Sequence, residues 1–448
     1  MRTAPRRTTG RVWQAAAVAG LLGVLGACGG SSGPNNAPST SDCSVAGQNA
    51  QIVAIMQSWY YWYPLLPGNV NPAAYATPQT LLDALIQPQP LDRFSFILSK
   101  SASQAFFGAG QYVGYGFGID VTPSNQLKVT RVFPGSPAEG GGLARGDEIT
   151  VINGVAVATL IAQNQLSAAL ASGSPGVVIT LTFVDLKHAT HNATLTSAVV
   201  TQPSVAGTRI ASAGRDKVGY IQFDSFIDPS NAELDQVFGQ FVAEGVTRLV
   251  IDERYNGGGE VSVAQHLVSL IAGNALAGRP IATLTYNDKH TEQNHTIAFA
   301  SVSNALDLNQ VVFITSRSTA SASELVINAL RPYISVATVG DATFGKPVGE
   351  NGFDVCSNVL YPITFQIKNA VGFGDYFDGL AATCPAADDL GHPLGDASEA
   401  SFATALRYVR TGSCGPAAAA EARESVLREA AHPRQAMRYD WRQLVGAY

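Results

Sequence analysis

Two apolar patterns in the second half of the chain lie on either side of residues 315–324. Residues 311–314 form a short, β-branched apolar run, which is typical of a buried parallel strand. Apolar residues then recur at helical spacing over 325–330, and Pro332 ends the predicted helix. The pattern therefore predicts that Ser321 lies where a strand turns into the start of a helix.

Strand and helix patterns alternate over residues 202–408. A strand pattern at 218–223 precedes a helical pattern at 231–244, and a second strand is predicted at 248–251. Such alternation predicts a layered α/β domain.

Two further patterned regions precede this domain. Residues 48–100 show mixed helical spacing, and we interpret the aromatic residues 59–63 as the core of a small helical subdomain rather than as a ligand platform. Residues 104–201 are rich in glycine and in short alternating runs, and Asn153 with Gly154 forms a tight-turn signal. This second region is therefore predicted to be β-rich.

The N-terminal end carries a different pattern. Four arginines within the first 11 residues precede an apolar segment at 15–24, which is too short to span a membrane as a mature helix. The segment ends at Leu-Gly-Ala-Cys28 and resembles a bacterial lipoprotein signal, which implies cleavage after residue 27 and a lipidated Cys28. An ordinary secretory signal is the alternative.

Residues 29–42, which are rich in Gly, Ser, Pro and Asn, predict a flexible tether between this anchor and the folded body. We therefore expect the protein in the cell envelope, anchored to a membrane by lipid. Gly29 resembles outer-membrane sorting in Gram-negative bacteria, which implies the periplasmic face of that membrane.

Composition agrees with several globular domains, because 46% of the 448 residues are hydrophobic and 14% are charged. The formal net charge of −6 gives no reason to expect nucleic-acid binding. No CxxC or HExxH spacing occurs, and the carboxylates at 388–389 lack the spacing of an EF-hand, so we expect neither a metal nor a cofactor.

Four cysteines remain when Cys28 is set aside. An even number in an exported chain indicates disulfides, and four cysteines allow three pairings. We predict Cys356–Cys384, which closes a local loop, together with Cys43–Cys414, which ties the ends of the chain.

The candidate chemistry lies in Ser321 and Lys346, which are 25 positions apart. Ser321-Ala-Ser-Glu324 has the form of a helix capping box, and capping alone is one interpretation of this serine. A helix start also offers free N–H groups for a developing oxyanion. Lys346, held extended by Pro347 in an apolar segment, can lose solvation and accept a proton as a neutral amine. Serine with lysine is a known variant of the catalytic triad.

The segments T-A-S-A-S-E (319–324) and T-F-G-K-P-V-G-E (343–350) resemble the C-terminal processing (tail-specific) proteases, which use a serine–lysine dyad. The resemblance implies that Ser321 is the nucleophile and Lys346 its base. The family usually has a glutamine four residues after the lysine, whereas this chain has Glu350. A carboxylate favours the charged lysine, although a protonated Glu350 could orient the neutral amine.

The segment D-E-R-Y-N-G-G-G at 252–259 follows a predicted strand and resembles the D-L-R-x-N-x-G-G segment of the same family, with glutamate in place of leucine. Bare glycines let a substrate carbonyl approach, so the N–H of Gly258 or Gly259 could form an oxyanion hole with that of Ala322. We interpret Asp252 and Arg254 as a structural pair that holds this loop. His266, which also follows it, is interpreted as a helix-surface histidine.

Residues 104–201 resemble a PDZ domain. The resemblance rests on Gly116-Phe117-Gly118-Ile119 and on the downstream landmarks G-S-P-A (135–138), G-D-E-I (146–149) and N-G (153–154). It implies that a nest of N–H groups at 114–118 captures the carboxylate of a peptide C-terminus, and that the adjacent strand edge pairs with the peptide. Turn formation alone is the other interpretation of these glycines.

These inferences predict an α/β (α+β) multidomain chain. Its parts are a signal peptide (1–28), a tether (29–42), an N-terminal helical subdomain (43–103), an inserted β-rich PDZ domain (104–201), a layered ClpP/crotonase-like serine-protease core (202–412) and a C-terminal tail (413–448). The predicted function is a serine endopeptidase that acts on proteins or peptides with free C-termini. Two alternatives are a catalytically inactive peptide- or ligand-binding envelope lipoprotein and a scaffold that holds its partner through the PDZ domain.

Overall fold

The computed structural model of the chain describes residues 42–416. The predicted signal peptide, Cys28, all but the last residue of the predicted tether, and the C-terminal tail beyond 416 lie outside the described residues. In the described part, none of the helices is both long enough and apolar enough to cross a bilayer.

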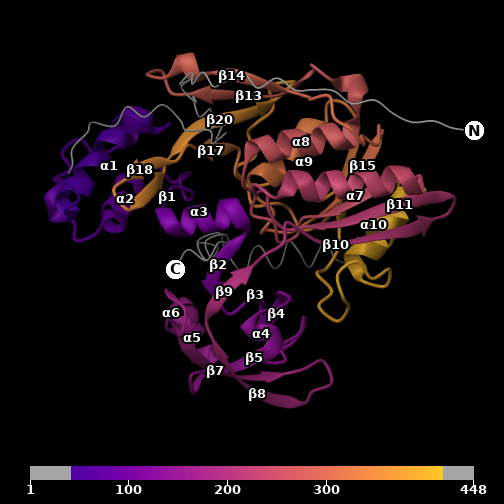
Figure 1. Ribbon diagram of the computed structural model, residues 1–448, viewed down its shortest axis with the longest axis horizontal. Coiled ribbons are helices and arrows are strands. Elements are labelled where there is room, and N and C mark those ends of the chain that lie inside the picture. Colours follow the sequence, from indigo (N-terminus) through magenta and orange to yellow (C-terminus); the bar gives the residue numbers. More distant parts are fainter. Residues whose placement is uncertain (1–41, 417–448) are drawn as a thin grey trace, which may run out of the picture. The chain divides into compact units, whose positions relative to one another are not determined.

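A six-stranded sheet forms the centre of the largest domain (Figure 1). β10 and β11 pair in antiparallel fashion, and the remaining neighbours are parallel. In spatial order the strands are β10 (Val205–Ala213), β11 (Asp216–Phe223), β12 (Arg248–Asp252), β15 (Gln310–Thr315), β16 (Ser335–Gly340) and β21 (Cys384–Pro385). The strands predicted at 218–223, 248–251 and 311–314 are thus confirmed, with boundaries that differ by at most two residues.

Helices cover both faces of this sheet, and the side chains of β12 show how. Leu249 and Ile251 face one way, into the core that contains the apolar sides of three helices, whereas Val250 faces the other way, toward α10 (Ala400–Thr411). Because both faces are buried, the strand is apolar throughout rather than alternating. The three helices on the first face are α7 (Ser230–Glu244), α8 (Val261–Ala272) and α9 (Ala322–Leu330).

Two smaller sheets lie beside this domain. The four-stranded sheet has the order β14 (His295–Ala298), β13 (Pro280–Tyr286), β20 (Ile363–Asn369) and β17 (Val348–Glu350). The three-stranded sheet has the order β1 (Phe96–Ser99), β19 (Asn358–Tyr361) and β18 (Phe353–Val355). Because β1 pairs with β19, the N-terminal part of the chain is joined to the segment that follows Lys346.

The N-terminal part is helical, as expected. It contains α1 (Val45–Trp59), the short helices η1 (Tyr63–Leu65) and η2 (Pro72–Ala74), and α2 (Pro78–Ile86). Trp59 and Tyr60 are buried in the main core, which agrees with a packing role for the aromatic cluster. Short helices η3 (Asn274–Leu276) and η4 (Thr291–Gln293) occur later in the chain.

The region at 104–201 is a β-rich domain with its own apolar core. α3 (Lys100–Ala109) leads into it, and β2 (Gln111–Gly114) pairs with β9 (Ala198–Thr201), so the entering and leaving strands close the insertion. Its main sheet has the order β3 (Phe117–Val121), β4 (Leu127–Val132), β5 (Glu148–Ile152), β7 (Val178–Val184) and β8 (Thr190–Thr196), with β6 (Val155–Ala156) paired to β5. The helices α4 (Pro137–Gly140), α5 (Val157–Ala162) and α6 (Leu166–Leu170) complete it.

The predicted disulfide pairing is wrong. The structure contains Cys43–Cys356 and Cys384–Cys414 in place of Cys356–Cys384 and Cys43–Cys414. Packing explains the difference, because α1 contacts β18 and so brings the residue before the helix to the β18–β19 turn. α10 runs back against the sheet and returns the chain to β21, where Cys384 lies. Each disulfide therefore ties one end of the described chain to the core.

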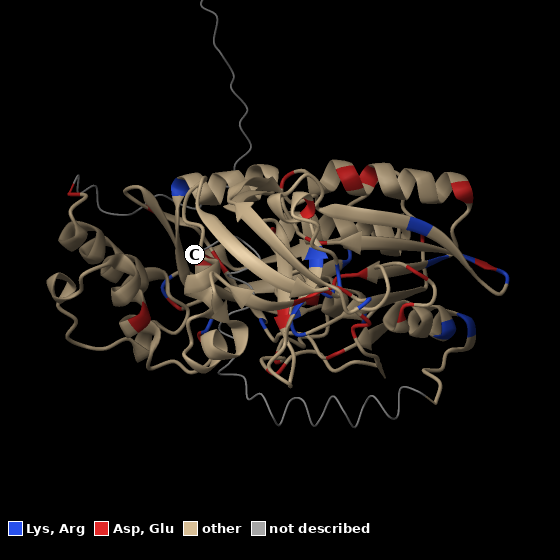
Figure 2. Cartoon of the chain, turned by 90° about the horizontal axis from the view of Figure 1, so that it is seen from below, with Lys and Arg blue, Asp and Glu red and all other residues tan. Residues whose placement is uncertain are grey.

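Charged residues of both signs mix in the middle of the view in Figure 2 rather than separating by sign. Some arginines and acids of the chain form buried ion pairs, which are described below.

Candidate active site

Ser321 stands at the turn between β15 and α9. Its backbone has φ +55° and ψ −113°, a conformation that residues with a side chain rarely adopt. The N–H of Ala320 donates to the carbonyl of Asn256 at 3.0 Å, and the capping box between Ser321 and Glu324 is present. Strained strand-to-helix turns also present the nucleophilic serines of other hydrolases. Capping and nucleophilic roles are therefore compatible at this position.

The glycine loop that follows β12 lies against this turn. A Cβ atom on Gly258 would be 2.7 Å from the Cβ of Ser321 and 2.8 Å from the nitrogen of Ala322. A Cβ on Gly259 would be 2.1 Å from the carbonyl oxygen of Phe226. Both glycines also have φ in the left-handed half of the map, at +100° and +137°. Only glycine fits at either position. Because these residues have no side chain, the loop can approach Ser321 closely.

The N–H groups near Ser321 differ in availability. The N–H of Gly258 donates to the side-chain oxygen of Asn256 at 2.9 Å, so it is not available to a ligand in this conformation. Within the described residues, the N–H groups of Gly259 and Ala322 donate to no other group. Of the three predicted oxyanion donors, Gly259 and Ala322 are therefore the free pair.

Lys346 lies in the segment between β16 and β18, which we call the lysine segment (residues 343–350). Its side chain is 9% exposed, and its Nζ is 2.6 Å from Oε1 of Glu350. Burial raises the pKa of Glu350, and the neighbouring Lys346 cation opposes that rise. Lys346 and Glu350 are thus paired in a nearly dry site.

The hydroxyl of Ser321 and the amine of Lys346 are not hydrogen-bonded to each other in the described structure. Their main chains are nevertheless joined through Glu324, which is fully buried. Its Oε2 accepts the N–H of Ser321 at 3.0 Å and the N–H of Lys346 at 2.8 Å. The two backbone nitrogens are therefore no farther apart than the sum of these two distances.

The other oxygen of Glu324 binds the same segment. Oε1 accepts the N–H of Gly345 at 2.7 Å and the hydroxyl of Thr343 at 2.5 Å. Burial raises the pKa of Glu324, while these four donors act in the opposite direction. Sequence reasoning assigned Glu324 to the capping box, but the pattern S-A-S-E gave no sign of its bonds to the lysine segment.

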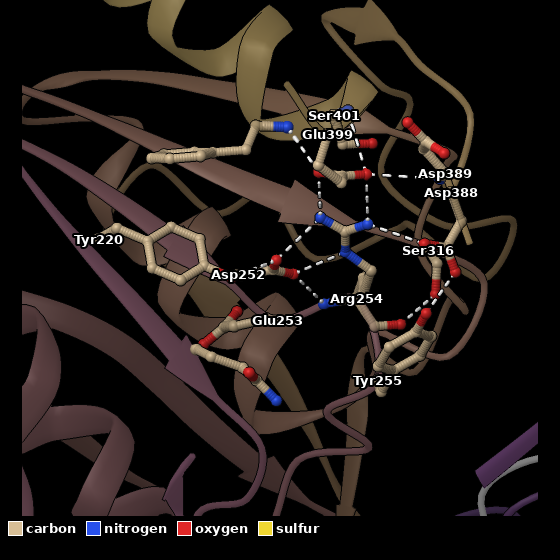
Figure 3. Close-up of polar contacts among 12 residues, drawn as sticks. Tyr220, Asp252, Glu253, Arg254, Tyr255, Ser316, Asp388, Asp389, Glu399 and Ser401 are labelled. Atoms are coloured by element: carbon tan, nitrogen blue, oxygen red, sulfur yellow. Dashed lines mark hydrogen bonds and ion pairs between the residues drawn. The ribbon is translucent and has the colours of Figure 1, made fainter. Parts of the chain in front are cut away.

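A buried ion-pair network supports the other end of the glycine loop (Figure 3). Arg254 is 2% exposed and pairs with Asp252 at 2.8 Å, which confirms the predicted structural pair. The same guanidinium bonds Glu399 at 2.9 Å and Asp388 at 2.8 Å. Neither of the last two acids was predicted as a partner, because they lie more than 130 positions away in sequence.

Glu253, which replaces the family's leucine, is fully buried, and neither carboxyl oxygen has a hydrogen-bond partner among the described residues. Burial raises its pKa well above the ordinary value, and the nearby Asp252 adds to this effect. Burial therefore favours the protonated form of this acid behind the loop. His266 lies on α8 and contacts Asp235 at 2.8 Å, apart from the serine, in agreement with a structural role.

The predicted peptide-binding residues lie together at one edge of the inserted domain. Gly116 has φ +85°, and a Cβ there would be 2.1 Å from the Cβ of Ser136. Phe117, Gly118 and Ile119 begin β3, which is an end strand of its sheet and pairs with β4 alone. Its other edge is thus unpaired in the described structure, and an extended peptide could add there.

Three parts of the chain are similar to known protein families. Residues 217–368 match Peptidase family S41, residues 47–96 match the Peptidase S41 N-terminal domain, and residues 128–185 match a PDZ domain. The match to Peptidase family S41 thus includes both Ser321 and Lys346. The β-rich insertion is accordingly a PDZ domain, and the predicted multidomain fold with an N-terminal helical region is confirmed.

The homologues include carboxyl-terminal-processing proteases. The chain is 27% identical over 252 residues to the carboxyl-terminal-processing protease of Picosynechococcus sp., a match that covers 55% of this chain and 57% of that protein. It spans little more than half the length of the curated relatives it matches.

Solved structures show the same fold. A crystal structure of a Bacteroides fragilis protein assigned to the S41 proteases has a TM-score of 0.64 at 26% identity, covering 81% of this chain and 97% of that chain. The photosystem II D1 C-terminal processing protease has a TM-score of 0.50 at 20% identity, covering 76% of this chain and 92% of that chain, and is alike in fold.

Proposed function

We propose that the chain is a serine endopeptidase that uses Ser321 and Lys346 as a dyad. The observation that carries the proposal is the single carboxylate of Glu324, which holds the strained turn of Ser321 and the main chain of Lys346 together. The match to Peptidase family S41 over both segments supports it.

In the proposed reaction, the Ser321 hydroxyl attacks a peptide carbonyl and its proton passes to the neutral amine of Lys346. The oxyanion accepts hydrogen bonds from the N–H groups of Gly259 and Ala322. The protonated lysine then donates to the leaving amine, and water hydrolyses the acyl-enzyme by the reverse sequence. Catalytic hydrogen bonds often close only in the substrate complex, so the hydroxyl must turn toward the amine when substrate binds.

Glu350 has a defined part in this scheme. Burial raises the pKa of Glu350, and in this scheme its protonated form lies beside Lys346 and orients the amine without imposing a charge on it. Glutamate can thus serve where the resembling family usually has glutamine.

Substrate recognition is proposed to lie in the PDZ domain. Its Gly116–Ile119 edge captures the free C-terminus of a protein or peptide and delivers the chain to Ser321.

We further propose a lipid anchor at Cys28 that holds the protein in the cell envelope. We expect the parent protein in the membrane fraction and the Cys28→Ser variant in the soluble fraction.

The test of the activity uses an unfolded substrate with a free apolar C-terminal tail and the same substrate with an amidated tail. We expect cleavage of the first to be faster, to disappear in Ser321→Ala, and to fall on the order of a thousandfold in Lys346→Ala. Tail-dependent cleavage that survives Ser321→Ala would reject the assignment.

One observation favours an alternative, a catalytically inactive receptor for peptides or other ligands on the same fold. The amine of Lys346 contacts Glu350 at 2.6 Å and is not bonded to Ser321. If this ion pair persists, the lysine stays charged and the serine is not activated. A serine-reactive phosphonate separates the enzyme from the receptor. Labelling of Ser321 that requires Lys346 supports the enzyme, and the absence of labelling supports the receptor.

A scaffold that acts through the PDZ domain alone would retain function in Ser321→Ala and lose it when residues 104–201 are deleted.

A further inference from the structure

A turn outside the protease core, residues 92–95 between α2 and β1, contacts the lysine segment through Arg93 and Phe94. The guanidinium of Arg93 donates to the carbonyl of Phe344 at 2.9 Å and to that of Phe377 at 3.2 Å, and its Cζ is 4.6 Å from the centroid of the Phe344 ring. Arg93 and Phe344 are 251 positions apart in sequence. The N-terminal subdomain therefore clamps the main chain directly before Lys346.

Phe94 lies over the amine itself. Its ring is 1% exposed and packs edge-to-face on Phe344 at a centroid distance of 5.8 Å. The Nζ of Lys346 is 5.6 Å from the centroid of the Phe94 ring. One side of the Lys346–Glu350 pair is thus formed by an aromatic ring from the N-terminal subdomain.

The position of the Phe94 ring is fixed by a buried turn. The carboxylate of Asp92 accepts the N–H of Phe94 at 3.0 Å, the N–H of Ser95 at 2.9 Å and the hydroxyl of Ser95 at 2.7 Å. The Ser95 oxygen in turn accepts the N–H of Ile363 at 3.0 Å, which ties the turn to β20. These bonds fix the main chain that carries the ring, and packing on Phe344 holds the ring itself.

An apolar neighbour changes which form of the pair is stable. Lys346 and Glu350 can share one proton as ammonium and carboxylate or as amine and carboxylic acid, and both forms have the same net charge. The ring face attracts an ammonium weakly at 5.6 Å, whereas excluding water removes the hydration of both ions and so disfavours the charged form. Only the neutral amine accepts the serine proton. Among the described residues, the titratable or charged groups near the pair include Asp92 on the turn, Glu324 on α9, Tyr361 on β19 and Arg93 over Phe344.

We propose that Phe94 is a positioning residue of the active site, whose ring shields the Lys346–Glu350 pair from water and so keeps the amine able to accept a proton. The N-terminal helical subdomain then completes the proton-accepting site of the core, in addition to covering it. This role rests on the proposed protease function. Phe94 touches no reacting atom and acts only through Lys346.

The test compares Phe94→Ala and Phe94→Leu with Phe106→Ala, a matched loss of a buried phenylalanine that lies on α3 and packs on Phe107. For Phe94→Ala we expect kcat at neutral pH to fall about ten- to a hundredfold with KM within about threefold of the parent. The rate should recover as the pH rises, because base removes the proton from the charged amine. Phe94→Leu, which stays apolar, should keep most of the activity, and Phe106→Ala should keep the parent's pH profile.

A second measurement does not depend on hydrolysis. The rate at which an amine-reactive anhydride modifies Lys346 is compared with that of the exposed Lys187 in each folded full-length variant. In Phe94→Ala the Lys346 rate should reach half of its plateau at a higher pH than in the parent, because a hydrated amine keeps its proton to higher pH, and Phe106→Ala should leave that pH unchanged. Unchanged modification of Lys346 and an unchanged pH profile of kcat in Phe94→Ala would overturn the role of Phe94.

If the parent shows no Ser321-dependent cleavage, the proposed function fails, while the modification rates still decide whether Phe94 shields the amine. If Phe94→Ala does not fold, Phe94→Leu and Phe94→Asn take its place. We then expect a loss of activity at neutral pH only in Phe94→Asn.

Discussion

At the residue scale, Glu253 stands out because it has the chemistry of a charged group and the surroundings of a core residue. It occupies the position of the leucine in the resembling segment, is fully buried, and has no partner for either carboxyl oxygen among the described residues. A buried polar group without a hydrogen bond destabilises the folded state by about 1–3 kcal/mol.

Glu253→Leu is therefore expected to stabilise the protein by about 1–3 kcal/mol at neutral pH, measured by urea unfolding. The gain should grow as the pH rises. Because the folded-state pKa is raised, the unfolded chain releases its proton from about pH 4.3 upward while the folded chain still holds it, so the parent loses stability with increasing pH. Glu253→Gln removes the charge but keeps the polarity. It should remove the pH dependence with little gain at low pH, and an unchanged pH dependence would contradict the burial argument.

At the scale of elements, the same kind of buried carboxylate has the opposite effect, because Glu324 is fully satisfied. It joins the start of α9 to the lysine segment through four donors. Two elements of the site are thus held in register by one side chain.

Glu324→Gln should separate them, because an amide oxygen replaces only one of the two acceptors and the NH₂ group then faces backbone donors. We expect a loss of roughly a hundredfold in kcat/KM and about 2–4 kcal/mol in unfolding free energy. Glu233→Gln is the matched control. Glu233 also lies in the first turn of a helix, α7, and accepts the Ser204 hydroxyl and the Val205 N–H at 2.7 Å each. A control with the same loss of activity would show that the effect is one of stability alone.

The positions of individual strands and helices were the part of the fold that the sequence predicted best. Apolar periodicity predicted the strands at 218–223, 248–251 and 311–314 and the helix after Ser321, because these segments are buried and their pattern follows from burial. Contacts between distant segments were not predictable in this way. The pairing of Cys43 with Cys356, the bonds of Glu324 to the lysine segment, and the approach of Phe94 to Lys346 depend on tertiary packing that no local pattern encodes.

At the scale of the whole molecule, the PDZ domain is fixed to the core by arginines. Arg131 on β4 pairs with Asp224 at 2.9 Å, and both side chains are buried. Arg145 donates to the hydroxyl of Tyr255 and to Asp388, both at 2.5 Å, and so reaches the ion-pair network behind the glycine loop. The insertion is therefore bound to the core by buried charges as well as by its two connecting strands.

Arg131→Met should cost about 3–5 kcal/mol at neutral pH, because it leaves the Asp224 carboxylate buried without its partner. Burial raises the pKa of Asp224, so the cost should shrink as the pH falls and this group takes up a proton. Thermal unfolding of Arg131→Met, Asp224→Leu and the double variant measures the coupling. The double variant should regain most of the stability, and simple additivity of the two losses would argue against a direct pair.

The Cys43–Cys356 disulfide determines where mechanical load enters the fold. A pull applied to the chain before residue 43 is transmitted through the sulfur bridge to the β18–β19 turn and bypasses the two helices that come next in sequence. That turn begins a few residues after Glu350. In an optical-tweezers experiment, the oxidised chain should resist as one block, whereas the reduced chain should first yield α1 and α2 at low force.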